Sequence, residues 1–169
     1  MTRLDDFRAR KNDLFGGSDQ SPLTPEQRAA FDGLAYFPEN EALALTLPVD
    51  RSAAGSDIVL DTSDGQKRQY RRVGTIDVPV GTETARLTLF AMPGHSRLFL
   101  PFFDGTTGTE SYSGGRYLEP RERPDGQVEV DFNYAYNPYC AYGEGWSCPI
   151  PPDENRVSPR IEAGEQNFS

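Results

Sequence analysis

The sequence is poor in lysine, histidine and cysteine. Lys11 and Lys67 are the only lysines, His95 is the single histidine, and the two cysteines are Cys140 and Cys148. Positive charge is also scarce, because 17 basic residues face 26 acidic ones and leave a formal net charge of −9. A protein that binds nucleic acid through its phosphates needs a basic surface. We therefore expect no nucleic-acid partner.

Long hydrophobic runs are missing as well. No apolar stretch approaches the ~18–20 residues that a membrane-spanning helix needs. Residues 1–14 carry charges throughout and lack the apolar centre of a signal peptide. We expect no membrane partner and a cytoplasmic location. With 36% hydrophobic and 11% aromatic residues, the chain still has enough apolar side chains to fold.

Glycine and proline are plentiful and unevenly placed. The sequence has 16 glycines and 14 prolines, which gather in segments 104–116 and 133–159. A chain of 169 residues buries about 69% of its surface on folding, so it can form a core without disulfides or metals. We predict one domain over 1–169, with a helical segment at 1–34, an antiparallel β core at 40–133 and an ordered C-terminal loop segment at 134–169.

The N-terminal segment predicts two helices. Over residues 4–14, apolar or long side chains recur every three or four positions, and a pair of glycines ends the pattern. A second helix is expected to begin after Thr24, because this threonine is followed by Pro25 and, three positions on, by Gln27. Gly33 is the expected end of the second helix.

After Pro38 the apolar side chains recur at every second position, which is typical of half-buried strands. Turn sequences at 63–65 and around Gly81 predict two hairpins. The predicted strands are 43–47, 58–60, 70–73, 75–80, 85–91, 97–103, 116–119 and 128–132. We predict an α+β fold that is mostly β: an antiparallel β-barrel or sandwich of about seven to nine strands, with two short N-terminal helices and a long ordered C-terminal loop rich in aromatics and proline.

The two cysteines lie in this C-terminal loop, with seven residues between them. A disulfide between Cys140 and Cys148 would stabilise the fold by roughly 2–3 kcal/mol. A zinc site would need further ligands, and a catalytic thiol would need a base; only His95, in a tight turn, could supply an imidazole. We favour a structural role for both cysteines, as buried residues or as a disulfide, and expect no metal.

The segment from Asp104 to Arg116 holds four glycines. Such a loop can bring backbone N–H groups close to an anion, or it can turn a hairpin. Neither the P-loop pattern nor the dinucleotide-binding pattern is present. Arg116 could hold a carboxylate or phosphate with its planar fork, or it could form an internal salt bridge, for example with Asp131.

Polar residues follow the last predicted strand. Asp131 and Asn133 share a face, because residues i and i+2 of a strand point alike. Asn137 precedes a proline, which favours a turn that caps local backbone groups. These residues could line a ligand pocket or form a dry hydrogen-bond network. Asp131 could also form an acid–base pair with Glu162 or Glu165.

Several motifs resemble those of one known family. They are Gly-Leu-Ala-Tyr-Phe-Pro at 33–38, Tyr-Arg-Arg-Val-Gly at 70–74, Leu-Pro-Phe at 100–102, Gly-Arg-Tyr-Leu at 115–118 and Asp-Phe-Asn-Tyr-Ala-Tyr-Asn-Pro at 131–138. Across nearly its whole length the chain resembles the prokaryotic family called domain of unknown function 1684. The resemblance implies no activity, cofactor or catalytic residue. Some members of that family look exported, behind a signal or lipoprotein sequence, and the charged residues 1–14 lead us to expect no such sequence here.

We predict a small-molecule binding domain whose polar or anionic ligand lies between the glycine-rich loop 104–116 and the aromatic loop 133–152. Arg116 is the predicted charge partner of the ligand. The other candidate ligand-binding residues are polar side chains and aromatic walls: Asp104, Tyr112, Asp131, Asn133, Tyr136, Asn137 and Tyr142. Two alternatives stay open, namely an enzyme that uses Cys140 or Asp131, and a structural or protein-interaction module. We expect no cofactor.

Overall fold

The N-terminal segment forms the two predicted helices. The computed structural model describes residues 2–52 and 54–168. Helix α1 spans Arg3–Gly17 and helix α2 spans Pro25–Ala30, and each follows a threonine whose hydroxyl accepts a backbone hydrogen bond. Helix α2 ends before Gly33, because Phe31 takes an extended backbone and packs its ring 6.3 Å from that of Phe15. Across the described ranges, no helix has the length and apolar character that crossing a membrane requires.

Three antiparallel strands build the two predicted hairpins. Strand β2 spans Asp57–Asp61, β3 spans Lys67–Val80 and β4 spans Glu83–Ala91, in the order β2-β3-β4. The two strands predicted on either side of Gly74 are one long strand, with a register shift between Arg72 and Gly74. A Cβ at Gly74 would lie 2.6 Å from Val49 Cγ1 and 2.7 Å from the Asp50 carbonyl oxygen. Glycine at this position therefore lets the segment before β2 pass against the sheet.

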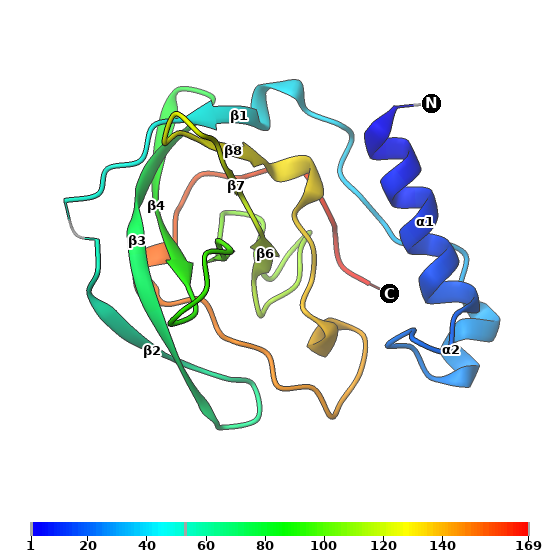
Figure 1. Ribbon diagram of the computed structural model, residues 1–169. Helices are drawn as coiled ribbons and strands as arrows, with labels where there is room; N and C mark the ends of the chain where they lie inside the picture. Colours follow the sequence, from blue (N-terminus) through cyan, green and yellow to red (C-terminus); the bar gives the residue numbers. More distant parts are fainter. Residues whose placement is uncertain (1, 53, 169) are drawn as a thin grey trace.

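The remaining strands form a second sheet and a two-stranded pair. A 3₁₀ turn, η1 (Glu41–Leu43), leads into β1 (Ala44–Leu47), and the other strands are β5 (Leu100–Phe102), β6 (Arg116–Leu118), β7 (Arg121–Glu122) and β8 (Val128–Asp131). They pair antiparallel as β1-β8-β7 and β5-β6. The mostly-β prediction is confirmed, with eight strands in the described residues. The sheets form a sandwich-like arrangement and do not close into a barrel (Figure 1).

The main core lies between these sheets and the C-terminal segment. Its buried side chains include Val78, Leu87, Leu100, Phe102, Val130 and Ile161. The C-terminal loop is ordered, as predicted, and holds three 3₁₀ turns: η2 (Phe132–Tyr134), η3 (Tyr139–Ala141) and η4 (Asp153–Asn155). The fully buried amide of Asn155 donates to the carbonyl oxygens of Thr88 and Pro101 at 2.9 Å and accepts from the Thr88 N–H at 2.7 Å. This side chain ties the loop to β4 and β5.

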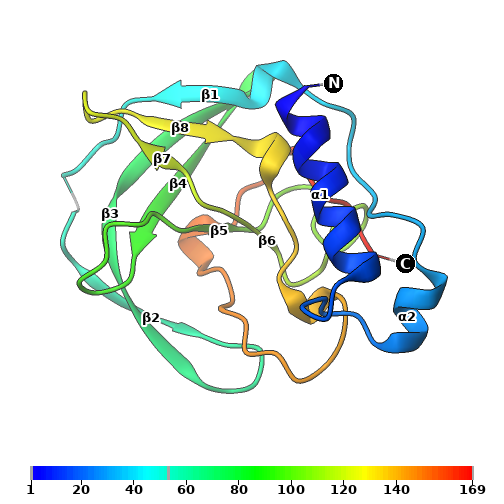
Figure 2. The same cartoon turned by 45° about the vertical axis from the view of Figure 1, so that its right-hand side comes forward.

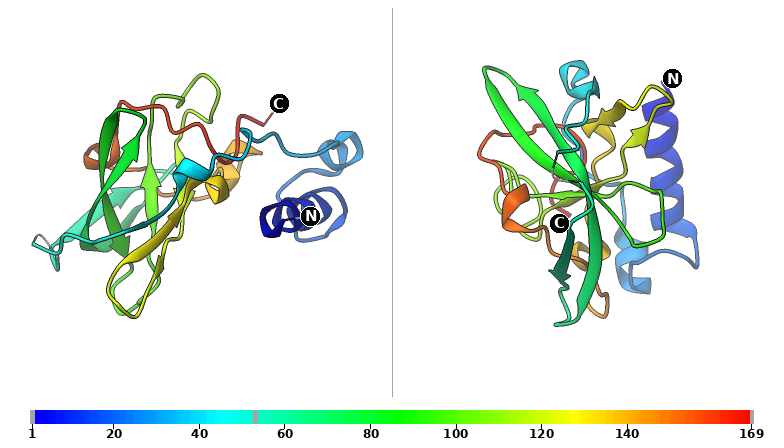
Figure 3. Two further views of the ribbon diagram at one scale, coloured as in Figure 1. Left: turned by 90° about the horizontal axis from the view of Figure 1, so that it is seen from above. Right: turned by 60° about the vertical axis from the view of Figure 1, so that its left-hand side comes forward.

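Helix α1 lies beside the strands rather than on them, as Figures 2 and 3 show. The Arg8 guanidinium lies 4.2 Å from the centroid of the Tyr36 ring, and Lys11 forms a salt bridge with the buried carboxylate of Glu165. The docking face of α1 is made of Leu4, Arg8, Lys11 and Phe15. These residues follow the helical spacing of three or four. The adjoining face of α1 is left to line a cavity.

Candidate functional site

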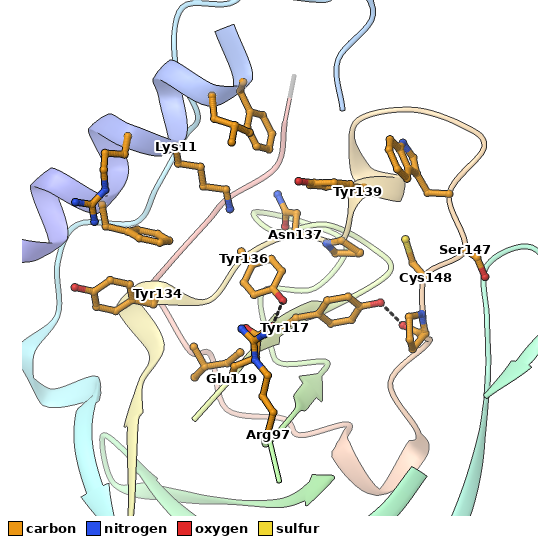
Figure 4. Close-up of a pocket in the computed structure, with 18 of the residues that line it drawn as sticks. Lys11, Arg97, Tyr117, Glu119, Tyr134, Tyr136, Asn137, Tyr139, Ser147 and Cys148 are labelled. Carbon is orange, nitrogen blue, oxygen red and sulfur yellow. Dashed lines mark hydrogen bonds between the residues drawn. The ribbon is translucent and has the colours of Figure 1, made fainter. Parts of the chain in front are cut away.

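A cavity of about 980 Å³ separates α1 from the aromatic loop and from the end of β6 (Figure 4). Its size is at the upper end of the range for small-molecule sites. The residues that line it include Phe7, Arg10, Lys11, Leu14, Phe15, Arg68, Arg97, Tyr117, Glu119, Tyr134, Tyr136, Asn137, Tyr139, Trp146 and Cys148. We call this the main cavity. A side cavity of about 560 Å³ adjoins it and shares Phe7, Arg10 and Tyr134 with it.

The helix supplies one wall through a second, regularly spaced face. Arg3, Phe7, Arg10 and Leu14 recur at intervals of four, three and four residues, so they lie in one row along α1. Phe7, Arg10 and Leu14 line the main cavity, and Arg3 lines the side cavity. The helix therefore carries a docking face and, beside it, a cavity-lining face, and Lys11 and Phe15 at the edge of the docking face also reach the main cavity.

Positive charge gathers in the main cavity of this acidic protein. Four lining residues are basic, namely Arg10, Lys11, Arg68 and Arg97, and one, Glu119, is acidic. Lys11 is paired with Glu165, and Arg68 donates to the carbonyl oxygen of Ser147 at 2.9 Å. Arg10 and Arg97 are exposed and make no salt bridge or side-chain hydrogen bond within the described residues. Their guanidinium groups remain free to pair with an anion.

The distribution of unpaired bases over the whole chain points to the same place. Nine of the 17 basic residues form salt bridges, which leaves eight without one in the part of the chain that the structure describes. Five of these eight line the main or the side cavity: Arg3, Arg10, Arg68, Arg97 and Arg121. The side cavity also has three acidic lining residues, Glu119, Glu129 and Asp131, so the excess of positive charge belongs to the main cavity.

Aromatic rings form most of the remaining wall. The rings of Phe7 and Tyr134 meet edge to face with centroids 5.0 Å apart, and those of Tyr139 and Trp146 do so at 4.9 Å. On the side of Tyr139 that faces the core, the ring of Phe15 lies edge to face with centroids 6.2 Å apart. Tyr139 is 37% and Trp146 is 39% exposed, so this pair faces both the cavity and solvent.

Two tyrosine hydroxyls and one amide add polar groups. Tyr136 donates to Glu119 Oε1 at 2.5 Å, and Tyr117 donates to the carbonyl oxygen of Pro149. Burial raises the pKa of both tyrosines, and the nearby carboxylate of Glu119 adds to the rise at Tyr136. Both rings therefore stay neutral near pH 7. Asn137 is buried, and its Oδ1 has no hydrogen-bond partner among the described residues.

A buried carboxylate joins the helix to the cavity wall. Glu165 is 1% exposed and binds the ammonium of Lys11, the hydroxyl of Tyr142 at 2.5 Å and the backbone N–H of Asn137 at 3.1 Å. Tyr142 is buried beside Phe15 and does not line the main cavity. Of these two predicted ligand-binding residues, Asn137 therefore lines the cavity, whereas Tyr142 packs behind the cavity wall.

Arg116 and Asp104 bind the C-terminal segment. Arg116 is 1% exposed, and its guanidinium donates to the carbonyl oxygens of Ile161, Ala163 and Glu165. Its acidic neighbour is Asp104, at 3.4 Å, and not Asp131. Asp104 also accepts from the Ile161 N–H at 2.7 Å and from nearby threonine hydroxyls. None of the residues 104–116, which form the glycine-rich loop, lines the main cavity.

The other predicted polar residues lie outside the main cavity. Asp131 Oδ1 accepts from the backbone N–H and the amide of Asn133, which in turn bonds the backbone of Asn40. Asp131 lines the side cavity. The ring of Tyr112 lies over Gly114, where a Cβ would approach it to 2.4 Å. Glu162, the weighed partner of Asp131, instead pairs with Arg160.

Both cysteines carry free thiols. Cys140 Sγ lies 3.0 Å from the Ser63 hydroxyl oxygen and donates to the Trp146 carbonyl oxygen at 3.4 Å. Cys148 lines the main cavity, and burial raises its pKa to about 11. A thiol with such a pKa is a weak nucleophile near neutral pH. Within the described ranges, no group of three or more His, Cys, Asp or Glu side chains is placed to hold a metal.

Arg10, Arg97, Glu119 and Trp146 were not among the predicted site residues. They come from a helix, a turn, a strand end and a loop that are distant in sequence. The one signal that could have indicated Arg10 is the row of Arg3, Phe7, Arg10 and Leu14 beside the docking face of the helix. Nothing in the spacing of the other three residues indicates that they meet.

Comparisons with known proteins agree with the resemblance of the motifs. Residues 29–166 match a family described as "Protein of unknown function (DUF1684)". A solution NMR structure of an uncharacterized protein from Haloarcula marismortui is 38% identical, with a TM-score of 0.72, over 97% of this chain and 92% of that chain. That coverage includes most of α1, which precedes the family match. The search of curated proteins gave no match. The chain belongs to the DUF1684 family.

Proposed function

We propose that this protein binds a small organic anion in the main cavity. The observation that carries the proposal is the pair Arg10 and Arg97, two exposed arginines that line the cavity and form no salt bridge with any described residue, in a chain of net charge −9. Guanidinium groups suit carboxylates and phosphates, because their N–H donors match these groups in a two-pronged geometry. We also keep a cytoplasmic location as part of the proposal.

Local charge outweighs net charge at this site. At physiological ionic strength the Debye length is about 8 Å, so distant acidic side chains are screened more than the arginines that touch the ligand. Once the salt bridge between Lys11 and Glu165 is counted as neutral, Arg10, Arg68 and Arg97 against Glu119 give the cavity a formal excess of two positive charges. An anion held this way should bind more weakly as salt is added.

The aromatic walls would supply affinity that charge alone does not give. Removal of about 100 Å² of ligand apolar surface from water contributes about 2.5 kcal/mol. The neutral hydroxyl groups of Tyr117 and Tyr136, two residues that line the cavity, offer polar contacts that can orient a ligand. These features favour an organic anion over a bare inorganic ion.

Binding is better supported than the enzymatic alternatives. Cys140, the candidate nucleophile, is not among the residues that line the main cavity, and its thiol donates to the Trp146 carbonyl oxygen. The raised pKa of Cys148, which does line the cavity, argues against a thiolate there. Asp131 is bonded to Asn133, and Glu165 is bonded to Lys11 and Tyr142, so the weighed acid–base pair belongs to two separate networks. The sequence predicted a ligand between the glycine-rich loop and the aromatic loop. In the proposed site the aromatic loop is still one wall, but the opposite wall is α1.

The test is a binding screen with a panel of carboxylates and phosphate monoesters, read by calorimetry at low and high salt. Loss of one charge-assisted hydrogen bond costs about 1.5–3 kcal/mol, so Arg97→Ala and Arg10→Ala should each weaken binding about 10- to 100-fold. Arg71→Ala is the matched control, because it removes an arginine that lines neither cavity. The proposal fails if no anion of the panel binds, or if all three variants bind as the unaltered protein does.

A further inference from the structure

Exposed apolar side chains gather at the mouth of the main cavity. The described residues include six large hydrophobic side chains that are exposed, and Leu14, Tyr139 and Trp146 account for half of them. All three line the cavity. Single exposed hydrophobic residues need no explanation, but three at the edge of one cavity mark a surface that a ligand can cover.

The aromatic residues at the mouth form a chain that runs into the core. The rings meet edge to face in each pair. The distance between ring centroids is 4.9 Å for Trp146 and Tyr139, 6.2 Å for Tyr139 and Phe15, and 4.9 Å for Phe15 and Tyr142. Phe15 and Tyr142 are buried, whereas the outer pair is more than a third exposed. The chain therefore ends in ring surface that no side chain of the described residues fully covers.

The charged groups lie on another side of the same cavity. In Figure 4, Arg97 and Glu119 lie across the cavity from Tyr139. Arg97 has no salt bridge in the described part of the chain, and Glu119 is held by Tyr136. A ligand that satisfies both sides carries its negative charge at one end and a flat apolar body at the other.

We infer that the ligand is an aromatic anion, in which a planar ring lies against Tyr139 and Trp146 while a carboxylate or phosphate pairs with Arg97. This inference rests on the proposed function and adds the chemical class of the ligand. Ring–ring contacts contribute beyond the area that they bury, because the positive edge of one ring meets the negative face of another. A saturated ring of equal size and charge loses this contribution.

The test compares two probes of the same charge and similar shape, naphthalene-2-carboxylate and its fully saturated decahydro analogue. Calorimetry gives both affinities, and the fluorescence of Trp146, the single tryptophan, reports contact at the mouth. The added stabilisation of ring pairs corresponds to about 2- to 10-fold tighter binding of the aromatic probe. We also expect that probe to change the Trp146 emission.

Two variants sharpen the comparison. Trp146→Leu keeps an apolar side chain and should reduce the preference for the aromatic probe while binding of the saturated probe changes little. Met92→Leu is the control, since Met92 is exposed and lines neither cavity. If Trp146→Leu fails to fold, the probe pair on the unaltered protein still decides.

Equal binding of the two probes would overturn the aromatic class and leave the proposed function standing. Failure of both probes to bind, while other anions of the panel bind, would also overturn the inference alone. Failure of every anion to bind, or unchanged binding in the Arg10 and Arg97 variants, would overturn both.

Discussion

Buried and exposed arginines have different roles in this protein. Arg116 is enclosed by three carbonyl oxygens and the carboxylate of Asp104, so its guanidinium binds groups of the chain itself and not a ligand. Arg10 and Arg97 are exposed and lack acidic partners within the described residues. The sequence made Arg116 conspicuous because it follows a glycine-rich loop, but burial cannot be read from a single residue and its neighbours.

Arg116→Ala should destabilise the fold strongly. The change leaves the buried carboxylate of Asp104 without its cation, and loss of one partner of a buried ion pair costs about 3–5 kcal/mol. Urea denaturation measures the free energy of unfolding. Arg160→Ala is the control, because its ion pairs with Glu110 and Glu162 are half exposed and are worth less than about 1 kcal/mol each. Equal effects of the two changes would contradict the structural role of Arg116.

Cys148 should react slowly in the folded protein. With a pKa of about 11, only about 0.1% of its thiol is ionised at pH 8, against roughly a quarter for an ordinary thiol. In a Cys140→Ser background the contact with Cys140 is gone but burial still raises the pKa of Cys148, so alkylation by iodoacetamide should be slower than in urea and should speed up as the pH rises from 8 to 10. Mass spectrometry follows the reaction. The same rate in folded and unfolded protein would refute the effect of burial.

At the scale of elements, local sequence signals predicted most of what the chain forms. The capping pattern at Thr24 and the turn around Gly81 specify backbone geometry within a few residues, and both are confirmed. The single long strand β3 was missed because its register shift at Gly74 reflects the approach of Val49, which is a tertiary contact. Helix α1 was predicted, but its docking on Glu165 depends on a residue 154 positions away.

The C-terminal segment should depend on one side chain, Asn155. Asn155→Ala leaves two backbone groups of Thr88 and one of Pro101 without partners in the core, and each unsatisfied buried group costs about 1–3 kcal/mol. We expect a loss of about 3 kcal/mol or more in the free energy of unfolding, measured in urea. Asn167→Ala removes an exposed amide that bonds Thr109 and should cost less than about 1 kcal/mol. A similar small loss at Asn155 would contradict its anchoring role.

At the scale of the whole molecule, the basic residues that form no salt bridge within the described residues lie mostly around the cavities. In a chain with a net charge of −9, nine basic residues form salt bridges within the part that the structure describes, and five of the other eight lie around two adjoining cavities. The sequence predicted an anionic ligand at the aromatic loop, and Tyr136 and Asn137 do line the main cavity. It could not indicate that α1 would form the opposite wall, because that depends on which face of the helix docks.

The location of the ligand is the central claim, and amide chemical-shift mapping by NMR tests it directly. We would titrate the ¹⁵N-labelled protein with naphthalene-2-carboxylate. The largest shifts should fall in residues 7–15, 117–119 and 134–149, which surround the main cavity, and Arg97→Ala should reduce them. Shifts confined to the glycine-rich loop at 105–115, or spread evenly over the surface, would contradict the account.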